Sequence, residues 1–144
     1  MSKDLDEITG LIVDAAYKLH VKLGPGLLET VYELVLAKEL EKLGLKVERQ
    51  KPISFEYDGI YFQDGFRVDL LVEDIVVVEL KSVEEMKPVF SKQVLTYLKL
   101  MDLPVGLLLN FGAATMKEGL HRIVNNYQDP PTPRPLQNRY SRGI

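Results

Sequence analysis

Residues 66–81 read FRVDLLVEDIVVVELK, which is two runs of mostly aliphatic residues with an acidic pair between them. This pattern predicts two antiparallel strands joined by a tight turn. The second run contains three consecutive valines, which are typical of a strand covered on both faces. Charged residues in such strands are costly unless they are paired or bind a metal ion. Asp69 in the first run, and Glu79 and Lys81 at the end of the second, are therefore candidate functional residues.

The length of the connecting loop decides whether Asp69 lies beside Glu79. A two-residue turn at 73–74 places the two carboxylates on opposite faces of the sheet. A three-residue loop over 73–75 places them on the same face, because a one-residue slip inverts every side chain. Lys81 projects with Glu79, since residues two apart in a strand share a face. Aspartate tolerates the left-handed backbone that such a loop often needs, so we expect the three-residue loop or a bulge.

Apolar spacing indicates helices and further strands around this hairpin. A first helix begins near Ile8 and is stopped by Leu23-Gly24-Pro25-Gly26, and a second runs over residues 27–43. The remaining expected elements are strands over residues 47–57, 60–62, 66–72, 75–80 and 105–110, a helix over 89–101 opened by Pro88, and a short edge strand over 121–125. This order predicts an α/β fold: a mixed sheet flanked by helices, with two N-terminal helices and a crossover helix after the Glu79–Lys81 strand.

The composition excludes several classes of site. The 144 residues fit one domain, and 18 Lys+Arg against 21 Asp+Glu give a net charge of −3, which excludes a polybasic protein. The chain has no cysteine and 2 histidines, so any metal site must be built from oxygens, which favours Mg²⁺, Mn²⁺ or Ca²⁺. No apolar run reaches the roughly 18 residues of a membrane span, and the N-terminus lacks a signal-peptide core. We therefore expect a cytoplasmic protein with no membrane partner.

Two carboxylates and a lysine at this spacing suit phosphodiester hydrolysis. The carboxylates of Asp69 and Glu79 would hold one or two hard divalent ions near the scissile phosphate. The ammonium of Lys81 would orient the attacking water or neutralise charge that develops in the transition state.

The segment Asp69-x9-Glu79-x-Lys81 resembles the core motif of the PD-(D/E)XK nuclease superfamily, although Val68 stands where the motif name has a proline. The resemblance implies a restriction-endonuclease-like fold and a nuclease that acts on DNA with Mg²⁺ or Mn²⁺. Asp69 and Glu79 would be its metal ligands, and Lys81 its catalytic lysine.

Two further motifs add to this resemblance, which covers about residues 5–127. GLLETVY, residues 26–32, matches the GxxExxY motif of a small prokaryotic family in that superfamily, and implies that Glu29 is a further, helix-borne catalytic acid and metal ligand. Gln93 and Tyr97 match the QxxxY helix motif of RecB-type nucleases, where it lines the active site. The three motifs in this order are much more specific than the core motif alone.

Each of these residues also has a structural interpretation. Glu29 near a helix start complements the helix dipole, and Tyr32 packs and braces it. Glu79 and Lys81 form a solvated strand end with a weak surface ion pair. Gln93 and Tyr97 lie on an exposed amphipathic helix.

Three functions therefore remain open for the domain, residues 1–127. The first is a metal-dependent nuclease that hydrolyses DNA. The second is a module that binds nucleic acid or a protein partner without cleavage, which the acidic pI of about 5.4 favours. The third is a subunit whose activity needs a partner. A homodimer is also open. The tail, residues 128–144, carries prolines and arginines that either contact phosphates or merely solubilise an extended arm.

Overall fold

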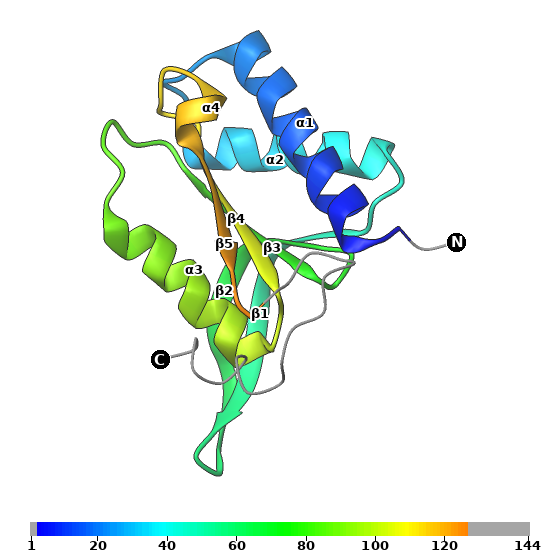
Figure 1. Cartoon of the computed structure of the whole chain (residues 1–144), viewed down its shortest axis with the longest axis vertical. Coiled ribbons are helices and arrows are strands. Elements are labelled where there is room, and N and C mark those ends of the chain that lie inside the picture. Colours follow the sequence, from blue (N-terminus) through cyan, green and yellow to red (C-terminus); the bar gives the residue numbers. More distant parts are fainter. Residues whose placement is uncertain (1–2, 127–144) are drawn as a thin grey trace.

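The computed structural model describes residues 3–126, so the tail expected over 128–144 lies outside the described residues. The elements, shown in Figure 1, are α1 (Leu5–Leu23), α2 (Glu29–Lys42), β1 (Val47–Tyr57), β2 (Ile60–Val72), β3 (Val76–Lys81), α3 (Pro88–Met101), β4 (Val105–Asn110), α4 (Met116–Gly119) and β5 (Leu120–Val124). The sheet has the strand order β1-β2-β3-β4-β5. Strands β3 and β4 are parallel and the other neighbours are antiparallel, which confirms the predicted mixed sheet.

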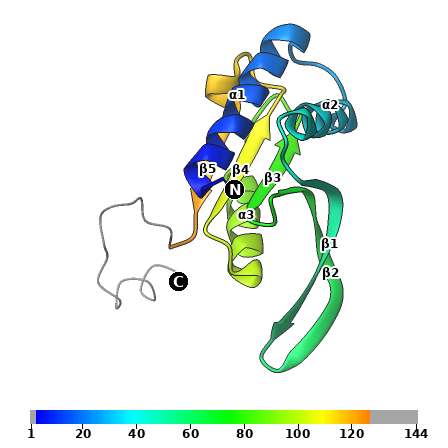
Figure 2. The same cartoon turned by 90° about the vertical axis from the view of Figure 1, so that its right-hand side faces the viewer.

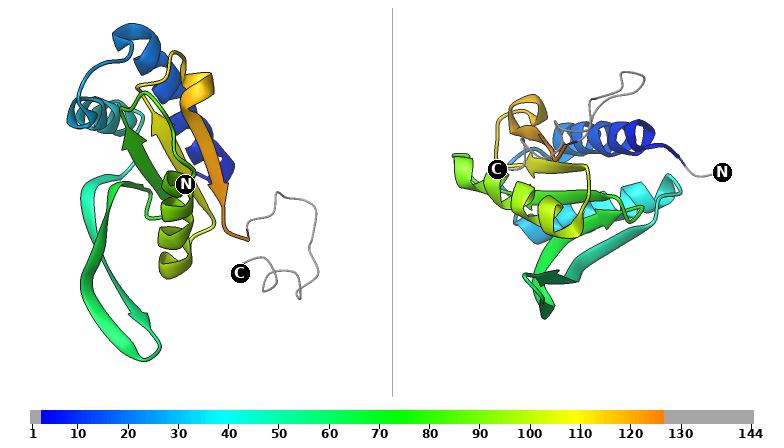
Figure 3. Two further views of the ribbon diagram at one scale, coloured as in Figure 1. Left: turned by 90° about the vertical axis from the view of Figure 1, so that its left-hand side faces the viewer. Right: turned by 60° about the horizontal axis from the view of Figure 1, so that its bottom comes forward.

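Helices cover both faces of the sheet, and an apolar core lies on each face (Figure 3). The first core joins α1 and α2 to alternate residues of β3, including Val76 and Val78. The second core joins α3 to Val77 of the same strand, as the continuous apolar run predicts. Helix α3 packs closely on β4, because a Cβ at Gly106 would lie 2.7 Å from Val94 Cγ1. The core thus leaves polar groups mainly at the strand ends.

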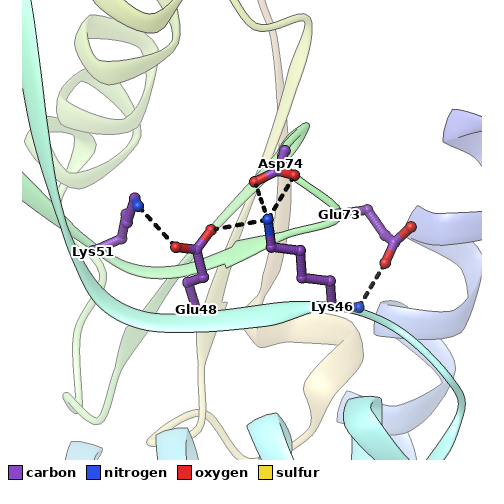
Figure 4. Close-up of polar contacts among 5 residues, drawn as sticks. All are labelled: Lys46, Glu48, Lys51, Glu73 and Asp74. Carbon is purple, nitrogen blue, oxygen red and sulfur yellow. Dashed lines mark hydrogen bonds and ion pairs between the residues drawn. The ribbon is translucent and has the colours of Figure 1, made fainter.

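A polar network holds the turn between β2 and β3 (Figure 4). Glu73 and Asp74 have φ angles of 52° and 57°, in the left-handed region. The Lys46 N–H donates to Glu73 Oε2 at 2.6 Å, and the Lys46 ammonium lies 2.9 Å from Asp74 Oδ2. The hydrogen bond between them raises the pKa of Lys46 and lowers that of Asp74. Glu48 extends the network, since its carboxylate lies 2.8 Å from Lys51 Nζ.

This turn is the predicted three-residue loop. Val72 pairs with Val76, and Leu70 pairs with Val78, so residues 73–75 form the connection. That register brings the next residues of the two strands, at positions 69 and 79, side by side.

The hairpin of β1 and β2 extends away from the rest of the molecule as a two-stranded arm (Figure 2). The expected strands over 60–62 and 66–72 are joined in one strand, β2, because the residues between them form a bulge opposite Ser54. In this bulge Asp64 has a φ of 50°, and its N–H donates to Ser54 Oγ at 3.0 Å. The prediction of a break was therefore wrong: a bulge accommodates the polar residues within the strand.

The predicted edge strand over 121–125 corresponds to β5, whereas the short helix α4 before it was not expected. The second helix begins at Glu29 rather than at 27, since the preceding residues form a loop. Within the described residues, no helix has the length and apolarity that crossing a bilayer requires.

Candidate active site

Asp69 and Glu79 meet where β2 and β3 separate. Backbone pairing of the two strands ends at Leu70 and Val78. Beyond this point side chains replace backbone acceptors: Glu79 Oε2 accepts the Asp69 N–H at 2.6 Å, and Asp69 Oδ2 accepts the Leu80 N–H at 2.9 Å. The two carboxylates are therefore held side by side by reciprocal hydrogen bonds, as the three-residue loop over 73–75 predicted.

Glu79 is the member of this pair whose pKa is shifted. Its side chain is buried, and burial together with the nearby charge of Asp69 raises its pKa to about 8. The charge of Glu33 acts in the same direction, while the Asp69 N–H and the Lys81 ammonium oppose the shift. A carboxyl with this pKa carries its proton at neutral pH, and a cation placed beside it would release that proton. Burial is thus the first cause of this shift, and the charge of Asp69 is the second.

Sequence reasoning missed Glu33 and Gln50, which connect α2 to this pair. The Gln50 amide donates to Glu33 Oε1 at 2.7 Å and to Asp69 Oδ1 at 3.1 Å. Gln50 has a φ of 48°, which is uncommon for a residue other than glycine and occurs preferentially at functional sites. Arg49 Nη2 lies 3.0 Å from Glu33 Oε2, an ion pair without hydrogen-bond alignment. Only the position of Glu33 one helical turn after Glu29 was visible in the sequence.

Two residues of the GxxExxY segment have structural roles, and the third does not. Gly26 has a φ of 108°, which favours glycine. Tyr32 is buried, and its hydroxyl donates to the Gly24 carbonyl at 2.6 Å and accepts the Leu27 N–H at 3.1 Å. Glu29 is exposed on the first turn of α2 and makes no polar contact with another described residue. Backbone conformation therefore explains the glycine, and packing with hydrogen bonding explains the tyrosine, but neither accounts for the acid.

The loop before α2 is attached to the end of β3. The Ser82 hydroxyl donates to the Leu27 carbonyl at 2.6 Å, so the segment that carries Glu29 lies next to Lys81. The Lys81 ammonium lies 4.4 Å from the centroid of the Phe90 ring, a cation–π contact with α3. Lys81 forms no ion pair within residues 3–126, although its charge lowers the pKa of Glu79. Glu79 and Lys81 are thus neighbours in the same site without direct pairing.

Asn110 at the end of β4 fixes the chain just beyond Lys81. Its side chain is buried, accepts the Val83 N–H at 3.0 Å and donates to the Val83 carbonyl at 3.0 Å. Because β3 and β4 are parallel, Asn110 pairs with Lys81 in the ladder. The amide therefore positions the segment that follows the candidate catalytic lysine, a role that the sequence did not indicate.

Tyr97 lies near the carboxylates, whereas Gln93 faces solvent. The Tyr97 ring stacks on Phe66 with 4.3 Å between centroids and an interplanar angle of 8°. Burial raises the pKa of Tyr97, and the charges of Glu79 and Asp69 add to this shift. Gln93, one turn earlier in α3, is exposed and makes no polar contact with a described residue.

The oxygen donors of Asp69 and Glu79 fit a hard divalent cation. The carboxylates are adjacent, and that of Glu79 is buried. In the described part of the chain, no group of three or more His, Cys, Asp or Glu side chains is placed to hold one metal ion. Glu29 is therefore not brought together with the pair. The reason is its place on the exposed side of the first turn, while Glu33 takes the buried position one turn later.

Comparison with known proteins gives one family. A sequence model of the family described as PD-(D/E)XK nuclease superfamily matches residues 6–123. The matched segment contains every residue of the site described above. No curated protein and no solved structure matches the chain significantly.

Proposed function

The chain belongs to the PD-(D/E)XK nuclease superfamily, and from this premise we propose that it is a metal-dependent nuclease that hydrolyses DNA phosphodiester bonds. Within the superfamily we assign it to the GxxExxY family, on the motif formed by Gly26, Glu29 and Tyr32. One observation carries the proposal: the carboxylates of Asp69 and Glu79 are held side by side at the end of a buried strand by reciprocal bonds to backbone N–H groups, and Glu79 is buried. The charge of Asp69 adds to the cost of ionising Glu79, and a cation bound by both carboxylates would offset that cost.

Asp69 and Glu79 are the proposed ligands of Mg²⁺ or Mn²⁺, because carboxylate oxygens suit these ions. Nucleases of this superfamily generally use divalent metal ions. When bound, such an ion polarises the phosphate and lowers the pKa of the attacking water. Lys81 stabilises the negative charge that develops on the phosphate. Tyr97 beside the carboxylates and Gln93 at the solvent side of α3 contact the DNA strand.

Glu29 is the proposed additional acid of the site. It stands at the start of α2, in a segment that Ser82 ties to the end of β3, and it makes no polar contact with another described residue. Glu33 and Gln50 support the proposed metal ligands without binding the metal, since the Gln50 amide donates a hydrogen bond to Asp69 Oδ1. The positions of these two residues support a role in orienting Asp69 rather than in contacting DNA.

The test is DNA cleavage by the full chain, on single-stranded, duplex and branched substrates, with wild type and Glu79→Gln prepared identically. We expect cleavage with Mn²⁺ at least equal to that with Mg²⁺ and none with Ca²⁺. Glu41→Gln removes an exposed acid from the far end of α2 and serves as the matched control, with unchanged activity. Equal residual nicking by wild type and Glu79→Gln would assign the activity to a contaminant and refute the proposal.

A second candidate is a module that binds DNA or a protein without cleaving. The net charge of −3 and the contact of the Lys81 ammonium with Phe90 favour it. In that case wild type and Glu79→Gln bind DNA equally in Mn²⁺, and neither cleaves. If the chain is instead a subunit that needs a partner, the wild type gains nuclease activity when the partner is added, and Glu79→Gln does not.

A further inference from the structure

The tip of the β1–β2 arm is apolar and uncovered. Its four large apolar side chains are exposed by 65%, 56%, 65% and 40%, in the order Tyr57, Ile60, Tyr61 and Phe62. Figure 2 shows that the arm leaves the body of the molecule, so nothing else in the described chain packs over this tip. Tyr57, Ile60 and Phe62 share one face of the hairpin, because Tyr57 pairs with Ile60 and residues two apart in a strand share a face, whereas Tyr61 lies on the other face beside Glu56. Large apolar side chains exposed on both faces of an uncovered arm mark an interaction site.

The charge of the arm tip disfavours a phosphate backbone as its partner. Residues 52–66 contain no lysine or arginine and three acids, Glu56, Asp58 and Asp64. Nucleic-acid surfaces instead carry clustered basic residues, because neutralising phosphates supplies most of the affinity. The arm therefore fits a protein surface that is apolar at its centre and basic at its rim.

The groove between α1 and α2 has these properties. Its volume is about 300 Å³, at the small end of ligand pockets and suited to a few side chains. Its apolar wall comes from both helices and consists of Ala15, Leu19, Leu23, Val35 and Leu43. Its rim carries three lysines and two acids, namely Lys18, Lys22, Lys42, Asp14 and Glu39.

One of the rim lysines is available for a partner. Lys18 lies 3.0 Å from Asp14 Oδ2, and Lys42 lies 3.4 Å from Glu39 Oε1, so the two rim acids are already matched. Lys22 forms no ion pair with any residue between 3 and 126. The rim thus presents a net positive charge to an acidic, apolar segment.

We infer that the arm tip of one molecule docks into the α1–α2 groove of a second copy of this chain. The tip and the groove lie at opposite ends of the molecule in Figure 1, so the arm cannot fill its own groove. A two-fold axis satisfies both surfaces at once, because each copy then gives its arm and receives the other arm. The proposed dimer does not require that the protein cleaves DNA. The docked arm is continuous with the candidate active site, since its strands β1 and β2 also carry Gln50 and Asp69.

The test measures the dimer dissociation constant of the full chain by sedimentation equilibrium. We expect wild type to dimerise, and Tyr61→Ser in the tip and Lys22→Glu in the groove each to raise the constant on the order of tenfold or more. Val21→Ser removes an exposed apolar side chain from α1 outside the groove and should leave the constant unchanged. Because all these side chains are exposed, thermal unfolding of the variants should match wild type.

A charge-swapped pair makes the test specific. Glu56→Lys combined with Lys22→Glu should recover most of the affinity that Lys22→Glu alone loses, because the rim and tip charges are then exchanged. A wild type that stays monomeric at every concentration overturns the inference, as does a dimer that Tyr61→Ser leaves intact. A monomer whose single-stranded DNA binding falls in Tyr61→Ser would overturn it as well and assign the arm to nucleic acid.

Discussion

The raised pKa of Glu79 predicts how the stability of the protein depends on pH. The pKa is about 8 in the folded protein, against an ordinary value of 4.5. The folded state therefore binds this proton more tightly than the unfolded state does. By linkage, Glu79 does not lower the free energy of unfolding below about pH 4.5. Between pH 4.5 and the folded-state pKa of about 8, that free energy falls by about 1.4 kcal/mol per pH unit. Above pH 8 the full cost is on the order of 5 kcal/mol.

Replacing Glu79 by Gln removes this ionisation while keeping the shape of the side chain. The amide oxygen still accepts the Asp69 N–H, which Glu79 Oε2 now accepts at 2.6 Å. We expect similar stability of wild type and Glu79→Gln at pH 5. At pH 8.5 the variant should be more stable by several kcal/mol, since it has no buried charge to form.

The assay is urea unfolding of both proteins from pH 5 to pH 9, with a chelator present so that no divalent ion contributes. Glu41→Gln is the control, because Glu41 is exposed and its replacement should shift the curve little at any pH. A constant difference between wild type and Glu79→Gln across this range would refute the reasoning. It would mean that Glu79 is solvated in the folded state.

Three further results are expected. Gln50→Ala should lower the unfolding free energy by roughly 1–3 kcal/mol, because two carboxylates lose a donor; Gln50→Gly should lose less, since glycine relaxes the positive φ, and equal losses would exclude that strain. Tyr32→Phe should cost roughly 1–2 kcal/mol in the same urea assay by releasing the loop before α2, and an unchanged midpoint would contradict this. Saturating Mn²⁺ should raise the melting temperature by mass action, by about 2.7 kcal/mol of stability at a hundredfold excess over Kd; an equal rise in Asp69→Asn would place the ion elsewhere.

The local pattern of residues 66–81 predicted the central hairpin, and the tolerance of aspartate for a left-handed backbone favoured the three-residue loop or a bulge over a two-residue turn. Alternation and apolar runs are properties of neighbouring residues, and they directly encode which side chains face the core. The same reasoning selected Asp69, Glu79 and Lys81 as candidates, because charges in a buried strand are conspicuous in any sequence.

The tertiary structure alone decided which acid of α2 approaches the strand pair. Glu33 and Gln50 are 17 residues apart, and Gln50 and Asp69 are 19 apart, so no local periodicity relates them. Their meeting depends on how α2 packs over the edge of the sheet and on the left-handed backbone at Gln50. The arm is a similar case: the bulge at Asp64 depends on a bond to Ser54 across the hairpin, and only the folded sheet shows how far beyond it the strands extend. Sequence determined what each segment prefers, and packing determined which of those segments meet.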